Sequence, residues 1–187
     1  MKYLILGLGN IGEEYENTRH NIGFKIIDKL TKDNSISISL DRHAYIGELK
    51  YKGRTLILAK PTTYMNLSGK ALQYWMQREK IPIEHVLIIV DDIALPFGTV
   101  RMKAKGSDGG HNGLKHIQQT LGHSNYARLR FGIGNNYAKG RQIDYVLGEW
   151  GADEQKDLST YIDKSIEGIF QFVSLGIDKA MTVTNQK

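Results

Sequence analysis

A short apolar run that ends in two aspartates constrains the fold of this chain more than any other feature. Residues 86–90 read VLIIV, and Asp91 and Asp92 follow them directly. A continuous run rich in β-branched residues, without polar alternation, is typical of a strand that is covered on both faces of a sheet. In α/β proteins helices supply that cover. We therefore expect an interior strand whose carboxyl end carries two carboxylates.

The rest of the chain alternates between strand-like and helix-like patterns. Strands are predicted over residues 2–6, 45–50, 54–59, 98–102 and 127–133, and helices over 21–32, 114–121, 153–175 and after residue 66. Asn21 and Asn66 are suited to be helix N-caps, and Lys52-Gly53 is a hairpin signal. Because repeats and linkers are lacking, we predict one α/β domain over residues 1–187, whose hairpin makes the sheet mixed.

Composition excludes several classes of protein. The chain has no cysteine, so a disulfide framework, a thiol nucleophile and a Cys-ligated zinc site are ruled out. The apolar run near the N-terminus covers only residues 3–6. A signal peptide needs about 7–15 apolar residues and a membrane span about 20. We therefore expect a soluble protein, located in the cytoplasm and not bound to membranes.

Basic residues are concentrated in one part of the chain. The net charge is +5, yet residues 99–141 contain eight Lys or Arg against one acid, and residues 142–187 contain four bases against eight acids. Such an asymmetry predicts a positive surface directed at a polyanion. A solvated basic face is the alternative, because aromatic residues do not alternate with the basic ones as they do in proteins that bind single strands.

The sequence G-x-G-x-x-G occurs at residues 7–12, directly after the first predicted strand. This pattern suggests a dinucleotide-binding fold, in which a helix begins within the motif and its N-terminus binds the pyrophosphate. Here a polar segment with Glu13, Glu14 and Glu16 follows, and its negative charge opposes phosphate binding. The motif is better explained by glycines that let the strand end turn sharply and bring Asn10 to the surface.

His20 follows that polar segment, and Asp91 ends the predicted interior strand. Ligand sites of open α/β sheets lie at the carboxyl ends of strands, and a histidine held by a carboxylate can activate water at neutral pH. Two alternatives stay open. Asp91 could simply cap a turn, and a metal site could be assembled from His20, Asp91, Asp92 and His111, which come from different segments.

Five blocks occur along the chain in a fixed order: GLGNIGEEYENTRHNIG (7–23), KPTTYMNLSG (60–69), DDIALPFG (91–98), KGSDGGHNGLK (105–115) and RLRFGIG (128–134). In order and spacing they resemble the bacterial-type peptidyl-tRNA hydrolase family. The resemblance implies one α/β domain with a twisted mixed sheet surrounded by helices. It also implies a monomer without an obligate protein partner, and an enzyme that cleaves the ester between a peptide and the 3′-terminal ribose of tRNA without metal or cofactor.

The resemblance also implies roles for individual residues. The catalytic histidine is His20, which as a neutral base takes a proton from water, and Asp91 orients it; Asp92 would take that role if the spacing to Pro96 shifted. The substrate-binding residues are Asn10, Tyr15, Tyr64, Asn66 and Asn112, and the tRNA-binding residues are Lys103, Lys105 and Arg130. Ala94 and His116 depart from the family pattern. An RNA-binding module, a dinucleotide-dependent enzyme and a metallohydrolase remain alternatives.

Overall fold

A sheet of seven strands in the order β2-β3-β4-β1-β5-β7-β6 organises the computed structural model, which describes residues 1–186. The strands are β1 (Lys2–Gly7), β2 (Ser39–Asp41), β3 (Ala44–Tyr51), β4 (Arg54–Pro61), β5 (Val86–Asp92), β6 (Val100–Lys103) and β7 (Ala127–Gly132). β4, β1, β5 and β7 run parallel, whereas β2, β3 and β6 are antiparallel to their neighbours. The predicted α/β class and mixed sheet are therefore confirmed.

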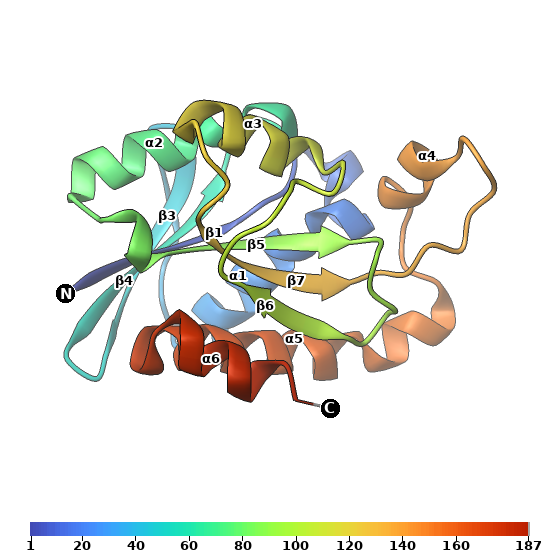
Figure 1. Cartoon of the computed structure of the whole chain (residues 1–187). Helices are drawn as coiled ribbons and strands as arrows, with labels where there is room; N and C mark the ends of the chain where they lie inside the picture. The colour runs from blue at the N-terminus through green and yellow to red at the C-terminus, as the bar shows by residue number, and fades with distance from the viewer. Residues whose placement is uncertain (187) are drawn as a thin grey trace.

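Helices cover both faces of the sheet (Figure 1). They are α1 (Ile22–Asp33), α2 (Ser68–Glu79), α3 (Asn112–Leu121), α4 (Gln142–Val146), α5 (Ala152–Leu175) and α6 (Ile177–Thr184), joined by short 3-10 turns that include η1 (Glu13–Tyr15), η2 (Arg19–Asn21) and η3 (Met65–Leu67). The apolar sides of α1, α5 and α6 pack on one face, and those of α2 and α3 on the other. Among residues 1–186, every helix is too short or too polar to span a bilayer.

β5 is the interior strand that the VLIIV run predicts. It lies between β1 and β7, and all of its apolar side chains are buried. Leu87 and Ile89 pack toward α1 and α5, whereas Ile88 and Val90 pack toward α2 and α3. The strand brings Asp91 and Asp92 to the carboxyl edge of the sheet, where β1 and β7 also end.

Two glycines let α1 approach the end of β1. A Cβ atom on Gly23 would lie 2.5 Å from the nitrogen of Leu8, and one on Gly7 would overlap the carbonyl oxygen of Gly23. Only glycine tolerates this contact between the two backbones. The first helix thus begins at Ile22, well after the G-x-G-x-x-G motif, and η2 is held over the carboxyl edge of the sheet. This geometry supports the interpretation of the motif as a turn instead of a dinucleotide site.

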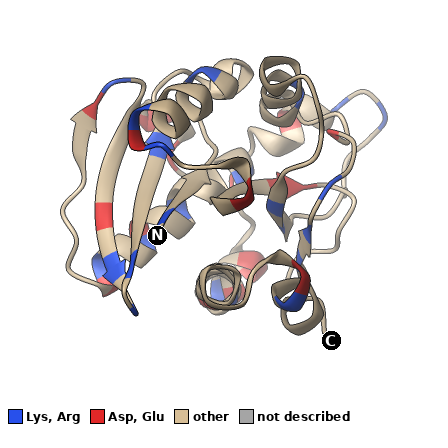
Figure 2. Cartoon of the chain, turned by 60° about the vertical axis from the view of Figure 1, so that its left-hand side comes forward, with Lys and Arg blue, Asp and Glu red and all other residues tan. Residues whose placement is uncertain are grey.

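The edge formed by β2, β3 and β4 has mixed charge. These strands, drawn toward the left of Figure 2, carry two acidic residues, Asp41 and Glu48, and three basic ones, Lys50, Arg54 and Lys60. The exposed side chains of Glu48 and Lys50 are 3.1 Å apart. The hairpin between β3 and β4 turns at Lys52 (φ 47°) and Gly53 (φ 78°). Two positive φ values in succession are typical of the type I′ turn that a two-residue hairpin prefers. The predicted hairpin is confirmed.

Candidate active site

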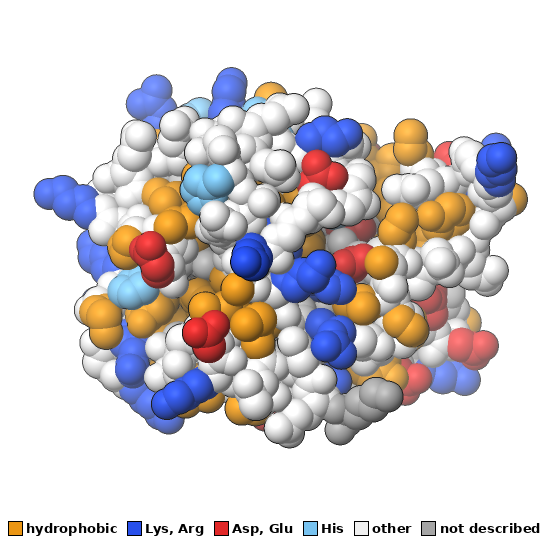
Figure 3. Space-filling model, viewed as in Figure 1, with side chains coloured by type: hydrophobic (Ala, Val, Ile, Leu, Met, Phe, Trp, Pro, Cys, Tyr) orange, Lys and Arg blue, Asp and Glu red, His pale blue; other side chains and the backbone are white. Residues whose placement is uncertain are grey.

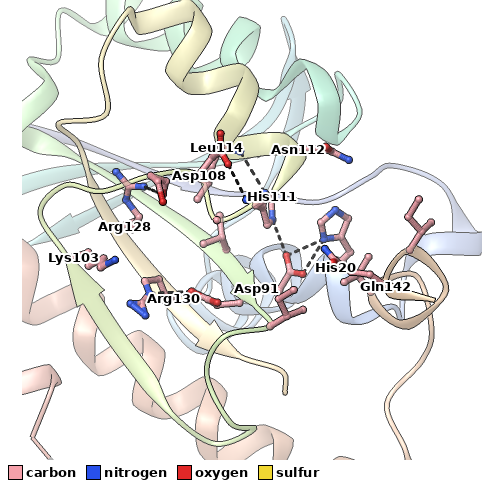
Figure 4. A pocket seen from close by; sticks show the side chains of 18 residues that line it. His20, Asp91, Lys103, Asp108, His111, Asn112, Leu114, Arg128, Arg130 and Gln142 are labelled. Carbon is pink, nitrogen blue, oxygen red and sulfur yellow. Dashed lines mark hydrogen bonds and ion pairs between the residues drawn. The ribbon is translucent and has the colours of Figure 1, made fainter. Parts of the chain in front are cut away.

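A cavity opens at the carboxyl ends of β5 and β7 (Figure 4). His20 of η2, Asp91 and Asp92 of β5, and Arg130 of β7 contribute to its lining. The remaining walls come from β6, from the glycine-rich loop before α3, and from α4. Segments from across the chain therefore meet at one edge of the sheet, where open α/β folds bind their ligands.

Asp91 lies at the centre of a buried hydrogen-bond network (Figure 4). Its two carboxylate oxygens are each 2.9 Å from Nδ1 of His20, and Oδ1 is also 2.9 Å from Nε2 of His111. Burial alone would raise the pKa of Asp91, but attraction and hydrogen bonds from the two histidines hold it far below its usual range. Asp91 is therefore an ionised carboxylate that accepts a hydrogen bond from each ring.

This network fixes the protonation of His20. Because an ionised carboxylate can only accept, Nδ1 of His20 carries a proton in both charge states of the ring, and Nε2 has a free lone pair when the ring is neutral. Burial lowers the pKa of His20, whereas the charge and hydrogen bond of Asp91 raise it, and the net shift is upward from 6.5. His20 is 8% exposed. A buried neutral imidazole with a free nitrogen and an anionic partner is equipped to act as a general base.

His111 connects Asp91 to a helix. Its Nδ1 accepts hydrogen bonds from the backbone nitrogens of Gly113 (3.1 Å) and Leu114 (3.3 Å), so His111 is the N-cap of α3. Since Nδ1 accepts, the ring proton is on Nε2 and points at Asp91. From the sequence, His111 was expected only as a possible metal ligand. Its position directly before an apolar helix pattern is the signal that could have indicated a cap.

The metal alternative can be tested against these hydrogen bonds. Ligand atoms of His20, Asp91 and His111 lie within 4.8 Å of one another, and two histidines with a carboxylate can bind zinc. A metal at Nε2 of His111 would move the ring proton to Nδ1, where two backbone N–H groups already donate. The Nδ1–H group would then face the backbone N–H groups of Gly113 and Leu114, and none of the three could accept a hydrogen bond. Asp92, the fourth residue considered, instead binds Arg130. The observed bonds fit a network built around a base better than a metal site.

Asn10 is held by Asn21 and in turn holds η3. The backbone N–H and carbonyl of Asn10 bond to the side chain of Asn21 at 2.9 and 2.8 Å, and its Oδ1 accepts the N–H of Met65 at 2.7 Å. The amide nitrogen of Asn10 is thus left as a donor. One expectation was wrong here, because Asn10 is buried (9% exposed) and not at the surface. Asn21 occupies the predicted N-cap position of α1, but its side chain binds Asn10 and makes no hydrogen bond to the helix.

The remaining substrate-binding predictions fall on exposed or half-buried positions. Asn112, the first residue of α3, lines the cavity. Asn66 is exposed within η3, and α2 has its N-cap at Leu67, so the predicted cap at Asn66 is wrong. Tyr64 precedes η3 with φ 61° and is 49% exposed. Tyr15 ends η1, and like Asn10, Tyr64 and Asn66 it is outside the described lining of the cavity.

Four basic residues share one face of the β6–β7 pair. Arg101 lies opposite Arg130 and Lys103 opposite Arg128, and directly opposed residues point to the same side of a sheet. Figure 3 shows Lys and Arg side chains grouped near the middle of this face of the molecule. Of the three predicted tRNA-binding residues, Lys103 and Arg130 line the cavity. Lys105 is exposed in the loop that follows β6.

Arg128 has a different task from the other basic residues. It is 1% exposed, and its two terminal nitrogens donate to the carbonyl oxygens of Gly106, Ser107, Ser124 and Tyr126 at 2.9–3.2 Å. Burial lowers the pKa of its guanidinium. These bonds anchor the glycine-rich loop that leads to His111. Arg128 therefore has a structural role. Its spacing of two residues from Arg130 along β7 indicates from the sequence alone that both side chains lie on one face of the sheet.

Comparison with known proteins agrees with this geometry. The family model described as peptidyl-tRNA hydrolase matches residues 4–187. The peptidyl-tRNA hydrolases of Cytophaga hutchinsonii and Bacteroides fragilis are 58% and 56% identical to this chain over 187 residues, with both chains fully covered. The crystal structure of peptidyl-tRNA hydrolase from Acinetobacter baumannii has a TM-score of 0.91 at 35% identity and covers 98% of this chain and 94% of its own. This chain belongs to the peptidyl-tRNA hydrolase family.

Proposed function

We propose that this protein releases tRNA from peptidyl-tRNA by hydrolysing the ester between the peptide and the 3′-terminal ribose. The observation that carries the proposal is the pair of His20 and Asp91. The buried carboxylate holds the Nδ1–H of His20, and the Nε2 lone pair is directed away from it. An arrangement of this kind serves water activation at neutral pH.

His20 acts as the general base in this scheme. Its Nε2 removes a proton from a water molecule while the water oxygen attacks the ester carbonyl. The resulting imidazolium is stabilised by the charge of Asp91, and it then gives the proton to the departing ribose oxygen. A ribose ester with a neighbouring hydroxyl is already reactive, so a covalent intermediate is unnecessary. General-base assistance of this sort contributes about 10²–10⁴-fold to the rate.

Asparagine side chains place the substrate. The amide nitrogen of Asn10, whose Oδ1 is occupied by Met65, can donate to the water or to the oxyanion that forms. One donor to an oxyanion is worth about 2.7–4 kcal/mol. Asn66 and Asn112, exposed at the starts of η3–α2 and α3, are assigned to the peptide amides, with Tyr15 and Tyr64 as further contacts. Lys103, Lys105 and Arg130 are assigned to tRNA phosphates.

We also propose that the reaction needs no metal ion or cofactor. The protons that the hydrogen bonds assign to His20 and His111 support this. The chain would act as a single domain over residues 1–187, as a monomer without an obligate protein partner, in the cytoplasm where translation produces the substrate.

One assay tests the proposed function. Release of tRNA from an N-acetylaminoacyl-tRNA is measured for the wild-type protein and for His20→Ala, each with and without EDTA. We expect EDTA to leave the rate unchanged and His20→Ala to lower it by about 10²-fold or more, with nearly unchanged tRNA affinity. Wild-type rates in His20→Ala would exclude His20 as the base. Loss of activity in EDTA, restored by a divalent ion, would revive the metal alternative.

A further inference from the structure

The second aspartate of β5 connects the catalytic edge to the basic face. Asp92 follows Asp91 directly, and its Oδ2 accepts a hydrogen bond from Nε of Arg130 at 3.0 Å. Its Oδ1 accepts the backbone N–H of Ala94 at 2.8 Å, which closes the turn after β5. The two side chains are only 23% and 14% exposed. Both oxygens of Asp92 therefore have fixed partners within the protein.

The bond through Nε leaves the outer edge of the guanidinium unused. Among residues 1–186, Nη1 and Nη2 of Arg130 have no hydrogen-bond partner, in contrast to the terminal nitrogens of Arg128. Lys103 lines the same cavity and is exposed. Two parallel N–H donors on a planar group match two oxygens of a phosphate. Arg130 thus offers a fork that its partner Asp92 keeps in one orientation.

We propose that Asp92 is a positioning residue that presents Arg130 to a tRNA phosphate. It thereby sets the distance between the anchored phosphate and His20, because Asp91 orients His20 and the adjacent Asp92 orients Arg130. This inference rests on the proposed function and extends it to a residue with no other assigned role. A side chain that is already ordered loses less conformational entropy when it binds.

A simpler role for Asp92 predicts the opposite result. If Asp92 only neutralises some of the positive charge of Arg130, its removal strengthens the attraction between the basic face and tRNA. If it orients Arg130, its removal weakens tRNA binding although the protein becomes more positive. The sign of the change in affinity therefore separates the two roles.

Asp92→Asn is the variant that tests this. The amide oxygen of asparagine can still accept from Ala94 N–H and keep the turn, but its NH₂ group cannot accept from Nε of Arg130. We expect the Kd for uncharged tRNA, measured by fluorescence anisotropy, to rise about three- to tenfold. Asp157→Asn, on the exposed surface of α5, removes the same charge without touching Arg130, and should leave the Kd within about twofold. A lower Kd for Asp92→Asn than for wild type would overturn the proposal.

A double-mutant cycle tests whether Asp92 acts through Arg130. Arg130→Ala alone should raise the Kd, and adding Asp92→Asn should raise it no further. Equal increases in both backgrounds would show that Asp92 acts independently of Arg130 and would refute the proposal.

Kinetics on two substrates complete the test. Asp92→Asn should lower kcat/KM on full-length N-acetylaminoacyl-tRNA more than on a short 3′-terminal oligonucleotide ester that lacks remote phosphates. The ratio of the two values should fall by the factor seen in Kd, and mostly through KM. An equal loss on both esters would mean that the change acts on Asp91 and the catalytic network instead. If the proposed function itself fails, the wild-type protein hydrolyses neither ester, whereas the binding measurements remain interpretable.

Discussion

The two ring nitrogens of His20 have different tasks, and Asp91 separates them. Nδ1 is bound to the carboxylate, and Nε2 is available to water. A general base must be neutral before it accepts a proton, so kcat/KM should rise with pH as His20 loses its proton. The pKa of His20 is raised above 6.5 by Asp91. We therefore expect the acidic limb of the pH profile to lie on the alkaline side of 6.5.

Asp91→Asn should move that limb in the opposite direction. Without the negative charge, burial is the main remaining influence, and it lowers the pKa of His20. The limb should shift to lower pH. On its plateau kcat/KM should fall by about 10²-fold, because no carboxylate then holds the Nδ1–H tautomer of His20 or stabilises its imidazolium form. The measurement is kcat/KM on N-acetylaminoacyl-tRNA between pH 5 and 9. A limb that stays at its wild-type position would show that Asp91 does not control His20.

Functional residues could be predicted from the sequence where a motif places them at the carboxyl edge of the sheet. The motif blocks predicted His20 and Asp91, which the structure places in hydrogen-bond contact. The link from Asn21 to Asn10 was missed, because an asparagine before a helix satisfies the cap pattern equally well. The choice between side-chain partners depends on the close contact of α1 with β1, which sequence periodicity does not contain.

At the scale of elements, the N-terminus of α3 is tied to catalysis through His111. Removing the ring by His111→Ala should cost about 1 kcal/mol of stability through the lost cap. Asp91 also loses a hydrogen bond, and bonds to charged groups contribute about 1.5–3 kcal/mol. We expect kcat to fall by at least about tenfold and the acidic limb to move to higher pH, because Asp91 attracts the His20 proton more strongly.

His111→Asn is the matched control for that experiment. Asparagine is a good N-cap but is too short to reach Asp91 from the same backbone position. Because it keeps the cap, His111→Asn should be more stable to thermal unfolding than His111→Ala by about 1 kcal/mol, whereas its kinetic defect should equal that of His111→Ala. If His111→Asn recovers activity together with stability, His111 serves only as a cap.

The α4 segment is attached to the catalytic edge through Arg19, the neighbour of His20. The guanidinium donates to the carbonyl of Tyr145 and to Glu154, both at 3.1 Å, and its carbon lies 4.1 Å from the centre of the Tyr145 ring. Arg19→Ala should therefore speed hydrogen exchange of the α4 amides by roughly tenfold. Arg141→Ala removes an exposed ion pair with Asp144 within the same segment and should change exchange little. Equal effects of the two variants would contradict this role of Arg19.

Elements with strong periodicity were predicted from the sequence, whereas three of the shorter ones were not. The interior strand, the hairpin and α5 all occur where apolar patterns predict them. β2, α4 and α6 were missed. β2 has three exposed residues and α4 has five without a buried one, so neither carries an apolar stripe. α5 ends at Leu175, where the predicted helix ends, but α6 begins directly after Gly176. A glycine that ends one helix does not prevent another from starting after it.

At the scale of the whole molecule, the charge asymmetry of the sequence becomes a surface with divided roles. Of the basic residues on the β6–β7 face, Arg128 donates its terminal N–H groups to backbone carbonyl oxygens. Lys103 and Arg130 line the cavity beside His20. The sequence predicted a positive surface because net charge is additive along the chain. It did not predict which cations remain available, because that depends on carbonyl oxygens brought close by the glycine-rich loop. The acidic C-terminal part forms α4, α5 and α6.

Binding of tRNA through Lys103, Lys105 and Arg130 makes a prediction about salt. Each phosphate contact lowers the logarithm of affinity by about 0.7–0.9 per unit of log salt concentration. In the triple alanine variant, the slope of log tRNA affinity against log salt concentration should therefore be less steep by about 2 to 3. KM on full-length substrate should rise while kcat changes little, because remote phosphates are bound equally in the ground and transition states.

A short 3′-terminal ester provides the control, since it lacks the distant phosphates. On that substrate the triple variant should lose much less of its kcat/KM than on full-length tRNA. A solvated basic face would instead leave both KM and the salt slope unchanged on either substrate. Measuring both substrates at three salt concentrations decides between the two, because only phosphate contact couples the loss of affinity to the slope. If the triple variant matches wild type on full-length tRNA, the phosphates are bound by another part of the surface.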